Sequence, residues 1–201
     1  MNKMGHLLVT SQLPGRLRRR HQACLMLGSI LPDLVVTTYC CGHTWDARSE
    51  KTMRAIRRLS EKGRQNCVSY LRLGYTLHYV EDYFTLPHNA WYGGSLSEHV
   101  AYERGFQRYL KSRRAAALSG AQALTAGSLT ESLRRMHERY EAEDSGFATD
   151  FRYIHQAAQQ MECSFFLIFQ RNQQAAIAVK RMGEHSFIYS YLPFTRAVHR
   201  S

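Results

Sequence analysis

Helical periodicity dominates this sequence: apolar residues recur every three to four positions along most of the chain, whereas the alternating pattern typical of strands is scarce. Only four prolines and 13 glycines occur in 201 residues, so long helices are favoured over a sandwich with many turns. We therefore predict an all-α, single-domain, multi-helix bundle spanning residues 1–201. The predicted helices cover residues 4–13, 17–29, 47–62, 65–84, 96–111, 128–143, 147–171 and 172–182.

The balance of charge favours a partner or substrate that carries negative charge. Lys and Arg total 27 while Asp and Glu total 16, which gives a formal net charge of +11. Phosphate groups, nucleic acid and an anionic membrane surface all meet that description. The run Arg16, Arg18, Arg19 and Arg20 is either a contact for such anions or a solvated helix start.

The sequence shows no signal for export or for insertion into a membrane. Its N-terminal segment lacks an apolar stretch of signal-peptide length. The longest apolar runs, such as residues 163–169, reach about seven residues, where about 20 are needed to span a bilayer. The five cysteines form no CxxC motif, so we interpret them as reduced structural thiols, with a perturbing role open for Cys40 and Cys41. We expect a cytoplasmic protein.

Histidines and carboxylates cluster between residues 78 and 103. His78 with Asp82, and His99 with Glu103, are each four residues apart, which places each pair on one face of a helix. His88 lies between them, just after the proline that ends the first helix. Imidazole nitrogens and carboxylate oxygens are ligands that zinc accepts. The cluster predicts a metal site, although buried histidines bonded to carboxylates among core aromatic residues would give the same pattern.

Other polar residues are less specific when they are taken alone. Asp33 follows a proline inside an apolar run, where a carboxylate needs a metal, an arginine or backbone amides to neutralise it. His43, in a glycine-bounded loop, and His6 are each ordinary histidines. A third pair with the same spacing, His137 and Glu141, is surrounded by acidic residues, and we interpret it as solvated helix surface.

The order of these residues resembles the zinc-dependent phospholipase C family, which shares an all-α fold with the S1/P1-type nucleases. The segments LGSILPD, LHYVEDYFTLPHN and SEHVAYE are especially similar to those of small intracellular bacterial members. The similarity covers residues 6 to about 110, so we expect a metal-site core at 1–110 and C-terminal helices at 128–201. The family's eight side-chain ligands find candidates in the right order: His6, Asp33, His43, His78, Asp82, His88, His99 and Glu103.

The resemblance implies two to three zinc ions as cofactors. The third position is left open, because this chain begins Met1-Asn2 where secreted members have a tryptophan. The implied ligand sets are Asp33, His43, His78 and Asp82 for one ion, His88, His99 and Glu103 for a second, and His6, Asp82 and the N-terminal amine and carbonyl for a third.

The resemblance also implies an activity: a phospholipase C-like, zinc-dependent hydrolysis of a phosphodiester by a metal-activated water, with the second zinc stabilising the leaving alkoxide. Asp33 would be both a ligand and the catalytic proton acceptor. A glutamate at position 103, where the nucleases usually have an aspartate, favours the phospholipase branch. Trp91 and Tyr92, in a glycine-rich loop, are our best candidates for apolar walls of a substrate pocket.

Three alternatives stay open. An S1/P1-like nuclease for single-stranded nucleic acid would need aromatic surfaces for base stacking beside the metals. A non-catalytic protein that binds zinc or anionic lipid would keep the ligands for folding, and a basic helical module would use no metal. Structural zinc is closed by four protein ligands, whereas the second set offers three, which favours a reactive site. The expected partner is a phospholipid or other phosphoester, and peripheral contact with an anionic membrane fits the charge.

Overall fold

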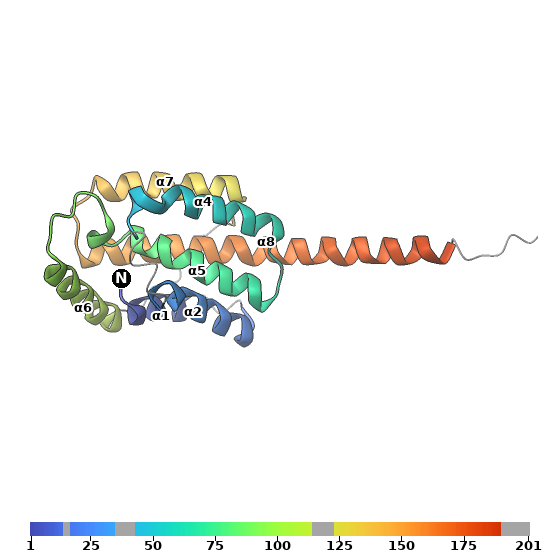
Figure 1. Ribbon diagram of the computed structural model, residues 1–201, viewed down its shortest axis with the longest axis horizontal. Coiled ribbons are helices and arrows are strands. Elements are labelled where there is room, and N and C mark those ends of the chain that lie inside the picture. The colour runs from blue at the N-terminus through green and yellow to red at the C-terminus, as the bar shows by residue number, and fades with distance from the viewer. Residues whose placement is uncertain (14–16, 35–42, 114–122, 190–201) are drawn as a thin grey trace, which may run out of the picture.

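The computed structural model describes residues 1–13, 17–34, 43–113 and 123–189, with side chains up to residue 180. Within these ranges all regular elements are helical, which confirms the predicted all-α fold class (Figure 1). Boundaries differ from the predicted ones by a few residues, except near the C-terminus. The elements are α1 (Lys3–Ser11), α2 (Arg19–Leu34), α4 (Trp45–Lys62), α5 (Cys67–Tyr83), the 3-10 helix η1 (Leu86–His88), α6 (Leu96–Ser112), α7 (Ala126–Glu141) and α8 (Phe147–Tyr189).

Helix α8 corrects the prediction of two helices at 147–171 and 172–182, because it runs unbroken for 43 residues. No glycine or proline interrupts residues 147–182, so nothing in the backbone stops the helix at the polar residues that follow Arg171. Asn172 instead donates hydrogen bonds from Nδ2 to the backbone oxygens of Ser60 and Gly63 at the end of α4, at 2.7 and 2.9 Å. The side chain of Asn172 thereby holds the end of α4 against α8.

The helices are arranged around α5 and the first half of α8. In Figure 1, α4 and α7 lie along one side of this pair and α1 and α2 along the other, while α6 closes the end where the N-terminus lies. The second half of α8 extends beyond the other helices. Within the described ranges, no helix combines the length and apolar character required to cross a lipid bilayer.

Two glycines let α2 and α5 approach closely. A Cβ atom added to Gly28 would lie 2.1 Å from the backbone oxygen of Leu71, and one added to Gly74 would lie 2.0 Å from that of Leu25. Any side chain at either position would therefore push the helices apart. This crossing lies one turn before His78, so it fixes the distance between the metal-site half of α5 and the end of α2.

His137 is buried, which corrects its interpretation as solvated surface. Its side chain is 1% exposed, its ring stacks on Trp45 at 3.8 Å, and Nε2 lies 2.9 Å from Oδ1 of Asn89. Glu141, its predicted partner, is exposed. His137 comes one helical turn after the core residue Leu133, so it lies on the apolar face of α7 despite the acidic residues around it in sequence.

Candidate metal centre

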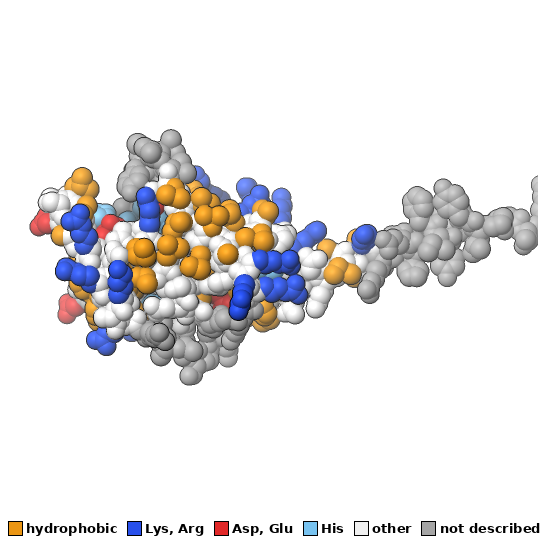
Figure 2. All heavy atoms as spheres, turned by 90° about the horizontal axis from the view of Figure 1, so that it is seen from below, with side chains coloured by type: hydrophobic (Ala, Val, Ile, Leu, Met, Phe, Trp, Pro, Cys, Tyr) orange, Lys and Arg blue, Asp and Glu red, His pale blue; other side chains and the backbone are white. Residues whose placement is uncertain are grey.

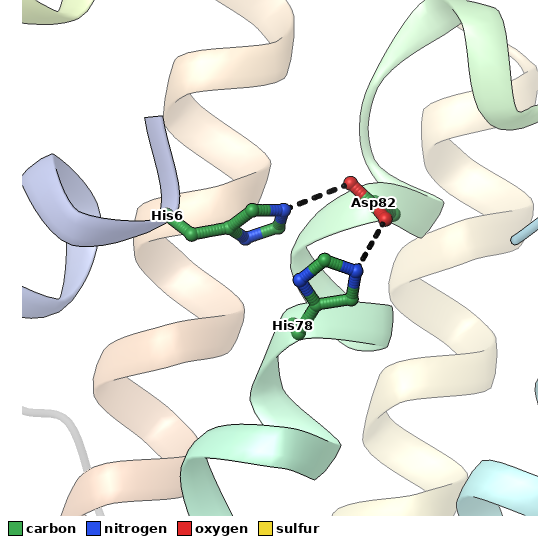
Figure 3. A group of neighbouring side chains, drawn as sticks. All are labelled: His6, His78 and Asp82. Carbon is green, nitrogen blue, oxygen red and sulfur yellow. Dashed lines mark ion pairs between the residues drawn. The ribbon is translucent and has the colours of Figure 1, made fainter. Parts of the chain in front are cut away.

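Asp82, in the last turn of α5, is the centre of a buried group of histidines. Its side chain is 1% exposed. Oδ1 lies 3.4 Å from Nε2 of His6, which α1 contributes, and Oδ2 lies 3.3 Å from Nε2 of His78 on the preceding turn of α5 (Figure 3). The two imidazole rings stack at 4.0 Å. Two histidines that are 72 positions apart in sequence therefore contact one carboxylate.

The structure gathers all eight predicted ligands into three groups, two of which overlap, each with its ligand atoms within 4.8 Å of one another. The predicted first set meets around His78, which belongs to two groups: one with His6 and Asp82, and one with Asp33 and His43. The groups are His6, His78 and Asp82; Asp33, His43 and His78; and His88, His99 and Glu103.

The spacing of three ligand atoms fits a zinc ion. His43 Nδ1, His78 Nε2 and Asp82 Oδ2 form a triangle with all three sides at 3.3 Å. Zinc bonds of about 2.0–2.1 Å in a tetrahedron place neighbouring ligand atoms about 3.3–3.4 Å apart. Asp33 Oδ1 lies 3.8 Å from His78 Nε2, on the cleft side of this triangle. The donor set and its dimensions thus match the metal that the sequence implies.

Hydrogen bonds orient the buried imidazoles so that Nε2 faces the cluster. His78 donates from Nδ1 to the backbone oxygen of Ser29 at 2.9 Å, which leaves the lone pair on Nε2. The hydroxyl of Thr85 donates a hydrogen bond to the backbone oxygen of Asp82. The oxygen of the same hydroxyl therefore accepts a hydrogen bond from Nδ1 of His88, at 2.7 Å. Both rings are thereby fixed in the form that binds a metal through Nε2.

Burial and charge set the protonation of the cluster. Burial lowers the pKa of His78 well below its usual range and that of His88 to about 3, so both rings are neutral at pH 7. Burial opposes a charge on His6 as well, but Asp82 and Glu81 outweigh it and raise the pKa of His6 to about 9. Ligands must lose their protons to bind a metal, so metal binding at His6 would release one.

The third group lies at the mouth of a cleft of about 670 Å³. His88 comes from η1, and His99 and Glu103 lie one turn apart on α6, with 3.2 Å between Nε2 and Oε1. The His99 contact helps to lower the pKa of Glu103 to about 2 against the effect of burial. The amino group of Met1 contacts Asp82 and lies 3.3 Å from Oε1 of Glu103. This amine therefore stands between the first and third groups.

Two glutamates that adjoin candidate ligands in sequence, Glu81 and Glu98, lie in different surroundings. Glu81 is fully buried, and its Oε2 lies 2.5 Å from Nδ1 of His6. No spacing rule reveals this contact, because the two residues are 75 positions apart. Glu98 is exposed and completes a capping box with Ser95 at the start of α6. Of these two glutamates, Glu81 is the one that orients a candidate ligand.

The predicted aromatic pocket walls lie outside the cleft. Trp91 is 44% exposed and packs near His137 and Tyr140. Tyr92 approaches His99 with 6.4 Å between ring centres. Aliphatic residues line the cleft instead, among them Met4, Pro87, Leu96 and Val100. Arg18, Arg19 and Arg20 are exposed, whereas Arg16, Cys40 and Cys41 lie outside the described residues.

Comparison with known proteins identifies a family. A family model described as zinc dependent phospholipase C matches residues 4–163, which is more than half of the chain and includes all eight candidate ligands. Neither the curated proteins nor the solved structures gave a significant match.

Proposed function

This chain belongs to the zinc-dependent phospholipase C family, and from that membership we propose that it is a zinc-dependent hydrolase that cleaves a phosphodiester bond of a phospholipid. The observation that carries the proposal is the triangle of ligand atoms from His43, His78 and Asp82, with sides of 3.3 Å that suit zinc. One corner of this triangle, His43, lines a cleft together with Asp33 and with the separate group of His88, His99 and Glu103.

Each group has a proposed role. His78, His43, Asp33 and Asp82 would hold one zinc, and the group on η1 and α6 would hold a second; His6 and Asp82 would hold a third. When bound, zinc supplies Lewis-acid chemistry that neutralises charge on phosphate oxygens and makes water a stronger acid. The ligands of the second zinc, His88, His99 and Glu103, would lie beside the leaving alkoxide.

We propose Asp33 as the general base that accepts a proton from the attacking water. It lines the cleft at the end of α2, and burial raises the pKa of its carboxyl above the usual value. A base with a raised pKa accepts a proton from water more readily than an ordinary aspartate does. The aliphatic wall of Met4, Leu96 and Val100 would bind the apolar part of the lipid and exclude water from this end of the cleft.

The composition of the cleft favours a lipid over a nucleic acid. A single-strand nuclease stacks bases on aromatic side chains beside its metals. Among the described residues that line this cleft, histidine is the only aromatic type, and those histidines are candidate ligands. The same walls are aliphatic, which suits the acyl chains of a lipid.

Metal content tests the proposal directly. The purified protein, reconstituted with zinc and assayed by elemental analysis, should hold two or three ions per chain, and His78→Ala and His99→Ala should each hold fewer. His155→Ala is the matched control, because His155 is a buried histidine on α8 outside all three groups. Phosphatidylcholine vesicles and single-stranded DNA are then offered to the zinc-loaded protein. Release of phosphocholine without DNA cleavage supports the lipid assignment, and absence of bound zinc contradicts the hydrolase.

A further inference from the structure

One face of the molecule exposes large apolar side chains on three adjacent helices. On α2, Leu27 and Leu34 are 48% and 51% exposed and lie seven residues apart, hence on one face of the helix. On α1, Met4 is 46% exposed. On α6, Leu96 and Val100 are 79% and 37% exposed and lie one turn apart. Single exposed apolar residues need no explanation, but a group on neighbouring elements does.

These helices are neighbours in the fold. Helix α1 packs against α2 on one side and against α6 on the other. Figure 2 views the molecule from the side on which α1 and α2 lie and shows hydrophobic side chains gathered there, bordered by Lys and Arg. The half-buried residues Met26 and Ile30 of α2 add to the apolar character of this face. We name it the α1/α2/α6 face, defined by Met4, Leu27, Leu34, Leu96 and Val100.

The α1/α2/α6 face surrounds one side of the metal cleft. Met4, Leu96 and Val100 line the cleft as well as contributing to the face. Asp33 lines the cleft and is followed directly by Leu34. A surface that covers this face therefore also covers the entrance through which a substrate would reach the candidate metal groups.

The charged residues on the same helices are mostly cationic. Among the described residues of α1, α2 and α6, Glu98 is the only acidic residue outside the candidate metal groups. Exposed cations are distributed over all three helices: Lys3 on α1, Arg19 and Arg20 on α2, and Arg104, Arg108 and Lys111 on α6. An apolar patch bordered by cations is the surface that binds the interface of an anionic membrane.

We propose that the α1/α2/α6 face docks on an anionic phospholipid bilayer, with its apolar side chains at the boundary between headgroups and acyl chains and the metal cleft open toward the lipid. The choice of a bilayer rests on the proposed function, because a phospholipase substrate is presented in a membrane. The contact is peripheral. Its apolar anchors are Leu27 and Leu96, which come from opposite sides of α1, and its cations supply the attraction to anionic headgroups.

Vesicle co-sedimentation tests docking without any need for catalysis. The probes are vesicles of phosphatidylcholine alone and of phosphatidylcholine with phosphatidylglycerol in equal parts. We expect the wild-type protein to bind the mixed vesicles more strongly, and to lose part of that binding at high salt because the charges are screened. Leu27→Asp and Leu96→Asp should each weaken binding about tenfold, since each removes an apolar anchor and adds a repulsive charge.

Val179→Asp is the matched control, because Val179 is 70% exposed on the part of α8 that extends away from this face. It makes the same change in charge and should bind vesicles as the wild type does. Leu96→Asp lies in the first turn of α6, where an acidic residue suits the helix dipole, so the fold should tolerate it. Circular dichroism of all three variants checks that each is folded.

The outcomes separate this proposal from the proposed function. Docking is supported if both face variants lose vesicle binding while the control keeps it. This holds even for a protein that contains no zinc. Wild-type protein that stays in the supernatant overturns docking, and so does binding that Leu27→Asp and Leu96→Asp leave unchanged. A concentration-dependent dimer that both variants dissociate, without vesicle binding, assigns the face to a second copy of the chain and also overturns it.

Discussion

His78 and Ser29 join the metal centre to the packing of the fold. Nδ1 of His78 donates to the backbone oxygen of Ser29 across the interface of α2 and α5, at 2.9 Å. That oxygen is within reach because Gly28 and Gly74 let the two backbones approach without side chains between them. The orientation of a candidate ligand therefore depends on two residues that contribute no ligand atom themselves.

Gly74→Ala should separate α2 from α5 and weaken both stability and zinc binding. The added Cβ would lie 2.0 Å from the backbone oxygen of Leu25, and backbone cannot rotate away as a side chain can. We expect a loss of about 2–4 kcal/mol in the free energy of unfolding, measured by urea denaturation. Gly127→Ala is the control: nothing lies within 4 Å of its added Cβ, so stability should stay equal or rise slightly. Equal behaviour of the two variants would refute the close-packing argument.

Glu81→Gln should weaken zinc binding while leaving the fold intact. Glu81 contacts Nδ1 of His6, and loss of its charge weakens the hydrogen bond that orients this ring and strengthens it as a ligand. We expect an affinity about 10- to 100-fold lower in competition with a chelator. Glu98→Gln changes an exposed glutamate that caps α6 and should keep the affinity of the wild type. An unchanged affinity in Glu81→Gln would remove Glu81 from the centre.

Asp150→Ala should disturb the third metal group in preference to the first. Asp150 accepts hydrogen bonds from the hydroxyls of Tyr102 and Tyr140 and from the backbone nitrogen of Leu86, at 2.5, 2.8 and 3.2 Å. Leu86 begins the short helix η1 that carries His88, so this carboxylate anchors a ligand. We expect about one zinc fewer per chain by elemental analysis and a stability loss of about 2–4 kcal/mol.

The exposed Asp144 provides the control for that variant, because Asp144→Ala changes the same type of side chain on the surface. It should keep the full zinc content and the stability of the wild type. If Asp150→Ala also keeps every zinc ion, the anchoring of η1 does not depend on this carboxylate.

His155 should make the protein sensitive to acid. It is 4% exposed, its two ring nitrogens have no hydrogen-bond partner among the described residues, and burial lowers its pKa to about 4. The unfolded chain takes up this proton at about pH 6.5 and the folded chain only near pH 4, so stability falls as the pH drops through that window. The loss amounts to about 3 kcal/mol from this residue. His155→Leu should flatten the measured dependence of unfolding free energy on pH between 6.5 and 4.

The same variant should be as stable as the wild type, or more stable, at pH 8. Leucine fills a comparable buried volume and needs no hydrogen-bond partner, whereas the neutral histidine leaves two polar atoms unsatisfied. A pH dependence equal to that of the wild type would show that other groups carry the acid sensitivity.

Local periodicity predicted most of the fold, because an apolar stripe on a helix is a property of neighbouring residues. His137 shows the limit of such reasoning. The acidic residues near it in sequence suggested solvent, yet its position one turn after Leu133 placed it in the core against Trp45. The continuity of α8 through residues 171 and 172 was also not predicted. The polar side chain of Asn172 suggested a break there, but its hydrogen-bond partners are on α4, more than 100 residues earlier.

The candidate ligands could be found from their order along the chain and from the family that this order resembles. Their grouping could not, because it depends on distances between helices. His78 lies close enough to serve two groups, and Glu81 contacts a ring 75 residues away. Both relationships follow from the way α1, α2 and α5 pack, which no spacing within one helix encodes.

The length of α8 has a consequence for how the protein unfolds. Its first half is built into the core, where Ile154, Met161 and Phe165 are fully buried, whereas most of residues 173–180 are exposed. A helix segment without tertiary contacts is marginal in water. The two halves of α8 should therefore unfold in separate steps. Backbone amides in residues 173–180 should exchange with deuterium within seconds. Those around Met161 should exchange only when the whole molecule unfolds.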